Sequence, residues 1–233
     1  MIDIRHKETG ALLMQVNAET LAGIQLSDEV LRGADLHGAD LRGIQLRRAY
    51  LIDVDLREAN LENARLNGAD LTDVLLNGAN LRSAHLTEAK IRSVDFRHAD
   101  LSGAALHNTF LINTALDEAT LTAANLRRAT LIATSLTRAS LSEADLTGAL
   151  LSGANVTQTN LAGACFAETF IADCQTLHEA FGLSAVKHLA ASSLDVRTLR
   201  ACAARLPDAF LLNVGYTPEE IHNLKTLYAQ PHP

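Results

Sequence analysis

The sequence contains nine histidines and three cysteines, the side chains that most often hold metal ions or act as nucleophiles. Zinc sites of the common kind use closely spaced Cys or His pairs, but Cys165, Cys174 and Cys202 include no CxxC pair and the histidines are scattered. No HExxH, GxSxG or Walker motif occurs. We therefore predict no catalytic, metal-binding or cofactor-binding residue and no enzymatic activity.

The charged residues suggest a solvated surface rather than a reactive centre. The chain of 233 residues has 27 acidic and 20 basic residues, a net charge of −7, which disfavours direct nucleic-acid binding. The first residues, MIDIRHKETG, lack the apolar region of a signal peptide, and no stretch is apolar enough to span a membrane. We expect a cytoplasmic protein with reduced thiols.

The strongest signal in the sequence is a period of five residues. From Leu21 to Ile171, every fifth residue is a large apolar one, in 31 consecutive units. We call this residue the centre of its unit. It is leucine in all but five units, in which it is Ile91, Phe96, Val156, Phe166 or Ile171. Two residues before the centre, 19 of the 31 units have alanine.

This period fits neither regular secondary structure. On an α-helix the centres would encircle the axis, and on a flat strand they would alternate between the two faces. Extended backbone that bends once in each unit keeps the centre and the residue two before it inward. Glycine at the second position after the centre, as in Gly33, Gly68 and Gly103, is typical of such a corner.

Four corners of about 90° close a square coil of about 20 residues, and coils stack about 4.8 Å apart through backbone hydrogen bonds. The sequence thus predicts about eight coils. Leucines fill the interior, and the paired position must be small because two large side chains would not fit. The predicted core includes Leu51, Leu56, Leu71, Leu101, Leu121 and Leu141.

Units such as GADLH, EANLE, GANLR and EADLT follow the pattern A(D/N)LXX and resemble the pentapeptide-repeat family over residues 19–173. The resemblance implies an all-β solenoid, a right-handed quadrilateral β-helix. The best-understood members look like duplex DNA in shape and charge. They bind type II topoisomerases and protect them from gyrase-directed drugs. Here, however, arginines such as Arg47, Arg48, Arg127 and Arg128 interrupt the acidic surface.

The two ends lie outside the repeat. Residues 1–18 predict an N-terminal β-hairpin cap, with its turn near Lys7 to Gly10. Residues 174–233 predict a small α-helical module, in which Ser193 caps one helix and Thr217-Pro218-Glu219-Glu220 begins another. Its segments LHEAFGLSAVKHLAASSLDVRTLR and LPDAFLLNVGYTPEEI loosely resemble a connector that precedes TIR-type domains in some bacterial pentapeptide-repeat proteins.

One outward face carries apolar residues where the opposite face has only polar ones. Residues one coil apart should stack in columns, and on this face the stack brings together seven candidate interaction residues. These are Tyr50, Ile52, Phe110, Ile112, Ile132, Leu150 and Phe170. Such a strip is uncommon on a soluble monomer. Three explanations remain open: cover by the C-terminal helices, a homodimer interface, or the binding site of another protein.

The sequence favours a non-enzymatic scaffold for protein–protein interaction, in bacterial signalling or defence. The partner is another protein or a second copy of the chain. The alternative is a DNA mimic that binds DNA gyrase or topoisomerase IV and modulates or protects it.

Overall fold

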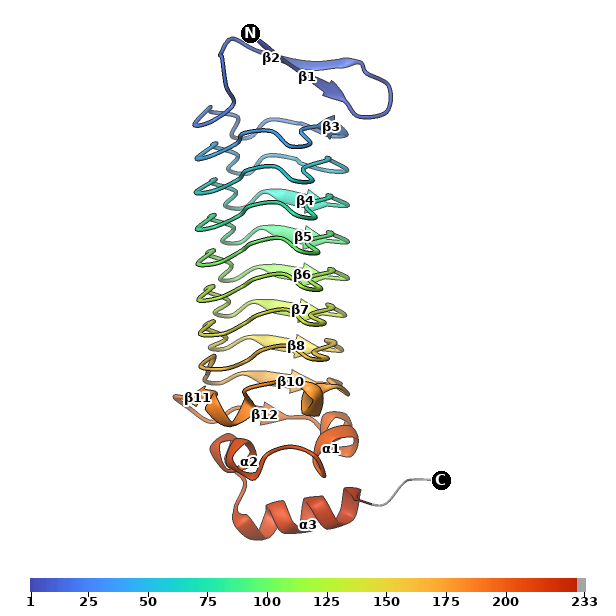
Figure 1. The fold of residues 1–233 in the computed structure, drawn as a ribbon, viewed down its shortest axis with the longest axis vertical. Coiled ribbons are helices and arrows are strands. Elements are labelled where there is room, and N and C mark those ends of the chain that lie inside the picture. Colours follow the sequence, from blue (N-terminus) through green and yellow to red (C-terminus); the bar gives the residue numbers. More distant parts are fainter. Residues whose placement is uncertain (230–233) are drawn as a thin grey trace.

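The computed structural model describes residues 1–229 and shows a β-solenoid with a hairpin at its N-terminal end and helices at its C-terminal end (Figure 1). The all-β solenoid predicted from the repeat is confirmed. Its short strands are β3 (Ala34–Asp35), β4 (Asp70–Thr72), β5 (Lys90–Arg92), β6 (Phe110–Ile112), β7 (Thr130–Ile132), β8 (Leu150–Ser152), β9 (Cys165–Phe166) and β10 (Phe170–Ala172).

The corners lie where the repeat places them. Every residue two places after a centre, from Gly23 to Asp173, has a φ between +49° and +71°. In most units the residue after the corner donates its N–H to the carbonyl of the centre, as Ala34 does to Leu31 at 3.1 Å. A left-handed third residue and this bond define a type II turn. Most of these corner residues are not glycine. The left-handed conformation costs a residue other than glycine about 1–2 kcal/mol, so the ladder must hold these residues in it.

Backbone hydrogen bonds join each coil to the next with a constant offset. Leu31 N–H donates to the carbonyl of Tyr50 at 2.9 Å, and Tyr50 N–H donates back to the carbonyl of Glu29 at 2.9 Å. On one face the rungs form a seven-stranded parallel sheet in the order β12-β10-β8-β7-β6-β5-β4. Regular strands therefore cover about six turns, slightly fewer than the eight coils predicted, because the first rungs are isolated bridges such as Val30↔Tyr50.

The interior is filled by the centres and the small residues that precede them. The leucines named above as core are at most 1% exposed. Each fully buried leucine contributes about 1.5–3 kcal/mol. Where threonine replaces alanine, its hydroxyl finds a backbone acceptor, as Thr159 Oγ1 does at the carbonyl of Leu136, 2.7 Å away. Such bonds let a polar residue occupy the dry core.

The N-terminal hairpin closes the first coil. Strands β1 (Ile2–His6) and β2 (Leu12–Val16) pair antiparallel, and β1 also pairs with β3. Ile4 of β1 is buried in the core, and Lys7 Nζ lies 2.6 Å from Asp53 Oδ1. Gly33 has no room for a side chain, because a Cβ there would lie 2.4 Å from His6 Nε2. The hairpin thus covers the open end of the core and one exposed backbone edge.

Beyond residue 173 the coil continues without its period. Two 3-10 helices, η1 (Leu177–Glu179) and η2 (Leu183–Ala185), precede strands β11 (Lys187–His188) and β12 (Ser193–Leu194). Lys187 pairs with Cys165 of β9, and Ser193 pairs with Phe170 of β10, so this last coil is longer than the regular ones. The division of the chain at residues 18 and 173 remains a prediction. The backbone ladder continues beyond residue 173, since β12 pairs with β10.

Three α-helices follow, α1 (Val196–Cys202), α2 (Asp208–Val214) and α3 (Pro218–Tyr228). In Figure 1, α1 and α2 lie below the last coil and α3 lies across the end beneath them. The prediction that Ser193 caps a helix is wrong. Ser193 is in β12, and the carboxylate of Asp195 accepts the N–H of Thr198 at 2.8 Å instead. The capping box at Thr217 and Glu220 is present as predicted.

We predict that enlarging the small inward residue destabilises the coil. Ala104 is buried, whereas its neighbour Ala105 is only half-buried and points outward. Ala104→Leu overpacks the core and should lower the free energy of unfolding by about 1–3 kcal/mol. The matched control Ala105→Leu should change it by less than about 0.5 kcal/mol. Urea denaturation followed by circular dichroism measures both, and equal stabilities would contradict the inward–outward assignment.

We also predict that mild acid weakens the C-terminal module. The ring of His188 packs between Phe166 and Phe210, with centroid distances of 5.9 and 5.4 Å, and burial lowers the pKa of His188. The unfolded chain then binds more protons, so this stabilisation is complete above the unfolded pKa of about 6.5 and is lost as pH falls through the folded pKa.

The melting temperature should therefore fall between about pH 7.5 and about pH 5.5, and His188→Phe should reduce that fall. His222→Phe, at an exposed position on α3, is the control and should retain the full pH dependence. Thermal melting in the far ultraviolet reports the helices. An identical fall in the wild type and both variants would refute the role of His188.

Candidate interaction face

The outward residues of the seven-stranded sheet and of the two bridged rungs before it form a flat ladder, which we call the sheet face. It comprises the residues immediately before and after the centres Leu31, Leu51, Leu71, Ile91, Leu111, Leu131, Leu151 and Ile171. The strands stack in register. Phe110 lies between Lys90 and Thr130, and Ile112 lies between Arg92 and Ile132.

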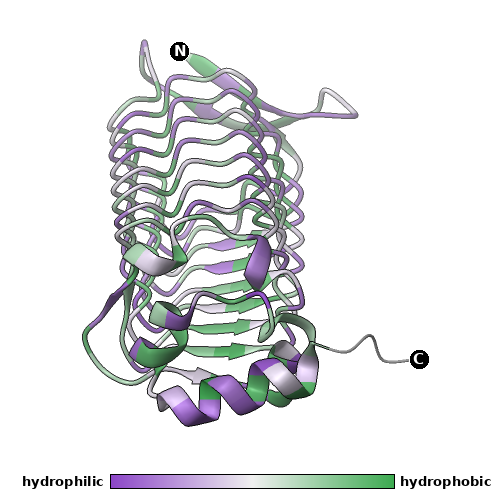
Figure 2. Ribbon diagram, turned by 60° about the horizontal axis from the view of Figure 1, so that its bottom comes forward, coloured by the Kyte–Doolittle hydropathy of each residue, from purple (hydrophilic) through white to green (hydrophobic). Residues whose placement is uncertain are grey.

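The seven candidate residues lie on the sheet face, where the stacking of successive coils places them. Phe110 is 51% exposed, Tyr50 49%, Phe170 45% and Ile132 37%. Ile52, Ile112 and Leu150 are half-buried by their neighbours. Figure 2 shows β6 hydrophobic along its length, whereas β5 is hydrophilic at both ends.

The C-terminal helices do not cover these side chains. They extend the long axis of the solenoid beyond β12 and leave the sheet face open (Figure 1). Of the three explanations for the apolar strip, cover by the helices is therefore wrong. Because β12 adds one rung beyond β10, the chain leaves the solenoid at its C-terminal end, and the helices that follow lie beyond that end.

Charged residues divide the sheet face into two apolar patches. Asp70 lies on one rung, with Asp73 at the corner that follows it, and Lys90 and Arg92 lie on the next rung. Within residues 1–229, none of these four side chains has an ion-pair partner; Asp70 accepts only a hydrogen bond from Thr72 Oγ1 at 2.6 Å. Neighbouring rungs thus carry opposite, unpaired charges between two groups of mainly apolar rungs, and Arg32 is a further basic residue at the N-terminal end of the face.

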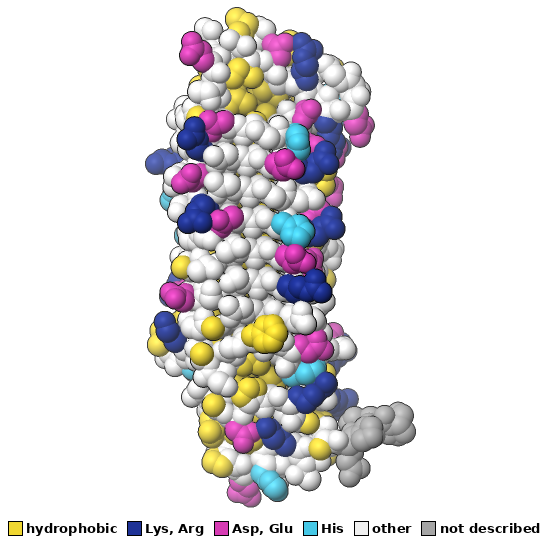
Figure 3. All heavy atoms as spheres, in the orientation of Figure 1, with side chains coloured by type: hydrophobic (Ala, Val, Ile, Leu, Met, Phe, Trp, Pro, Cys, Tyr) yellow, Lys and Arg dark blue, Asp and Glu magenta, His cyan; other side chains and the backbone are white. Residues whose placement is uncertain are grey.

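Several acidic residues on the other faces are paired with arginine. The nearest charged atoms of Asp55 and Arg57 lie 2.5 Å apart, those of Asp95 and Arg97 2.5 Å, and those of Asp145 and Arg127 3.1 Å. Hydrogen bonds from the guanidinium groups hold the pKa of Asp55 and of Asp95 below its usual range. Figure 3 shows basic and acidic side chains side by side along the edges of one face, so neither sign dominates.

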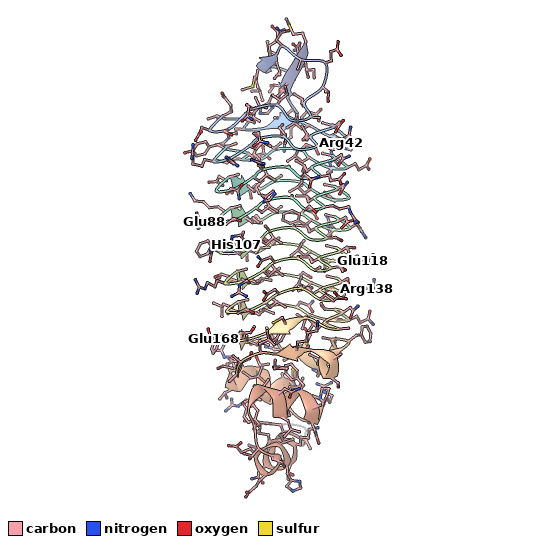
Figure 4. All side chains as sticks on the ribbon, turned by 90° about the vertical axis from the view of Figure 1, so that its left-hand side faces the viewer. Arg42, Glu88, His107, Glu118, Arg138 and Glu168 are labelled. Carbon is pink, nitrogen blue, oxygen red and sulfur yellow. The ribbon has the colours of Figure 1, made fainter. Side chains whose placement is uncertain are left out.

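The titratable side chains do not converge on a reactive centre. Glu118 and Arg138 lie on successive coils along one edge, and Glu88, His107 and Glu168 are spread along the other (Figure 4). Residues 1–229 contain no group of three His, Cys, Asp or Glu side chains that could hold a metal ion. No described helix is long and apolar enough to cross a membrane.

Two of the three cysteines are thiols in environments that suppress reactivity. Cys174 and Cys202 are buried, and burial raises the pKa of Cys174 to about 12 and also raises the pKa of Cys202. Cys165 is half-exposed. A thiolate is the nucleophilic form, so the buried pair is unreactive near neutral pH.

Two features of this face are not indicated by the residues that flank the centres. The first is Asp73, a corner residue two places after Leu71. Its position near Asp70 follows from the period if the corner residues are also treated as part of the surface. The second is the extension of the sheet by Ser193, with the exposed Val196 beyond it. The period of five does not predict this extension, because the last coil is longer than a regular one.

Two solved structures of about 30% sequence identity are pentapeptide repeat proteins. HetL, a pentapeptide repeat protein involved in heterocyst differentiation regulation from the cyanobacterium Nostoc sp. strain PCC 7120, is 30% identical; the match covers 73% of this chain and 89% of HetL, with a TM-score of 0.41. A pentapeptide repeat protein from the Arabidopsis thaliana thylakoid lumen is 31% identical over 47% of this chain and 66% of that one, with a TM-score of 0.21.

QnrB1, a plasmid-mediated fluoroquinolone resistance protein, is 19% identical; the match covers 87% of this chain and 94% of QnrB1, with a TM-score of 0.39. No curated protein matches the sequence. The family model described as pentapeptide repeats (8 copies) matches residues 30–68, 64–103, 99–138 and 139–174. These matches span most of the solenoid, and the chain therefore belongs to the pentapeptide-repeat family.

Proposed function

We propose that this protein is a non-enzymatic scaffold that binds a protein partner through the sheet face. The observation that carries the proposal is the exposed apolar ladder, in which Phe110, Ile132 and Phe170 stand outside the core and no described part of the chain covers them. Contiguous exposed apolar surface of this kind typically marks a binding site.

The architecture suits this role. Stacked rungs about 4.8 Å apart fix the outward side chains on a rigid, flat surface, so little conformational entropy is lost when a partner binds. Aromatic residues such as Tyr50 and Phe110 supply large contact area with few rotatable bonds. We place the protein in the bacterial cytoplasm, in signalling or defence. The free thiols and the similarity of its C-terminal segment to connectors before TIR-type domains support this placement.

Substitution on the sheet face should abolish partner binding. Phe110→Asp with Ile132→Asp puts charge into the apolar ladder, and each truncated anchor typically costs about 1–2 kcal/mol or more of binding free energy. The matched control is Thr120→Asp with Ser140→Asp, two outward residues of the polar column on the opposite face. Immobilised protein exposed to a native host extract, followed by mass spectrometry, measures the captured partner.

The wild type and the control pair should retain the same protein, and the sheet-face pair should lose it. Circular dichroism verifies that all three are folded. Identical captured proteins from all three, or none from any, would refute the proposed function.

The alternative function is a DNA mimic that binds DNA gyrase or topoisomerase IV. Such a mimic needs long runs of unpaired negative charge, whereas Asp55, Asp95 and Asp145 are each paired with an arginine. We therefore expect neither inhibition nor drug protection in a gyrase supercoiling assay at micromolar protein. Protection from a gyrase-directed drug would establish the alternative in place of the scaffold.

A further inference from the structure

We infer that the partner of the sheet face is a second copy of this chain, bound antiparallel. This inference rests on the proposed function, because it assumes that the sheet face is the binding surface. Four central rungs of the sheet face carry residue classes in an order that matches the same four rungs of a second, antiparallel copy. Successive rungs carry apolar Tyr50 and Ile52, then an acidic rung, then a basic rung, then apolar Phe110 and Ile112.

A two-fold axis in the interface, perpendicular to the solenoid and between the acidic and basic rungs, generates the matching contacts. It places Asp70 of each copy opposite Lys90 of the other, and Arg92 beside the rung that carries Asp73. On either side it places Tyr50 opposite Phe110 and Ile52 opposite Ile112. On the outermost rungs it places Val30 opposite Thr130 and the exposed Arg32 opposite Ile132, so the charge match is confined to the four central rungs. An interface of this kind is isologous, so every contact occurs twice.

Other registers lose this complementarity. In a parallel pair, Lys90 of one copy faces Arg92 of the other at the same level, and like charges directly opposite are destabilising. Shifting the antiparallel axis by half a rung places Lys90 opposite its own counterpart. Shifting it by a full rung in the C-terminal direction buries Lys90 against Phe110 with no carboxylate opposite. The charges therefore select one register.

The unpaired state of these charges supports the same conclusion. Arg57, Arg97 and Arg127, on other faces, each contact a carboxylate of their own chain. In the described part of the molecule, Lys90 and Arg92 form no such pair. Oppositely charged groups that stay unpaired within one chain are available to a second copy.

The overlap is large enough for a weak dimer. Six rungs, from Val30 to Thr130, oppose the same six rungs of the second copy, giving an area of about 600 Å² per copy at about 4.8 Å per rung and a width of about 20 Å. This is the low end for specific interfaces, so dimerisation should depend on concentration in the micromolar range. The overlap also brings Leu150 level with the N-terminal hairpin of the second copy, where Leu12 and Leu13 are exposed.

Charge reversal tests the register. In Asp70→Lys the new lysine faces Lys90 of the second copy, and in Lys90→Asp two aspartates face each other, so each variant should raise the dimer dissociation constant about 100-fold. The double variant and an equimolar mixture of the two single variants should both recover the wild-type constant. Sedimentation velocity measures the mass against the 25.0 kDa monomer, and melting curves verify the fold.

Cross-linking tests the orientation independently. In a Cys165→Ser background, Ile52→Cys and Ile112→Cys should join through a short thiol cross-linker when mixed, and neither should cross-link efficiently with itself. A wild type that stays monomeric at about 100 µM would overturn the inference. So would an Ile52→Cys protein that cross-links to itself, or a dimer that survives both charge reversals. The capture experiment above can still succeed with a different partner, so the failure of this inference is distinguishable from failure of the scaffold function.

Discussion

The backbone ladder of this solenoid tolerates no change of register. The coils are joined by backbone hydrogen bonds with a fixed offset, so that the N–H of Leu31 meets the carbonyl of Tyr50 and the N–H of Tyr50 meets the carbonyl of Glu29. One inserted residue would displace all following inward side chains to the outside. The chain avoids this by holding the period of five from Leu21 to Ile171, and it accepts left-handed corners at residues as unfavourable as Ala133.

The same register controls the surface. A side chain of one coil lies directly beneath the equivalent side chain of the next, so any residue type that recurs once per coil becomes a continuous column. On the opposite face this produces a wholly polar column through Asn60, Asn80 and Asp100. On the sheet face it produces two apolar patches with opposite charges between them. A rigid solenoid thus turns one-dimensional sequence spacing into a two-dimensional pattern of chemistry.

The ends of the solenoid follow different physical rules from its middle. A stacked coil has an exposed core and an unpaired backbone edge at each end. At the N-terminus an antiparallel strand, β1, satisfies both, and His6 takes the space that a side chain at residue 33 would need. At the C-terminus the chain adds an irregular coil and then covers it with helices, whose Phe210 packs against the core residue Phe166. Both solutions leave the sheet face free along its length.

Spacing in the sequence was enough to specify the coil, the inward residues, the corners and the columns, because in a strictly periodic chain it defines the neighbours of every residue. Tyr50 and Phe110 could be placed on one face without coordinates for that reason. Where the period ends, the outcome depends on tertiary contacts. Ser193 could have capped a helix by its local sequence, but a free rung on β10 offered its backbone better hydrogen bonds. Whether helices cover the sheet face also depends on the path of the chain after Asp173. No local spacing encodes that path, because packing against the last coil determines it.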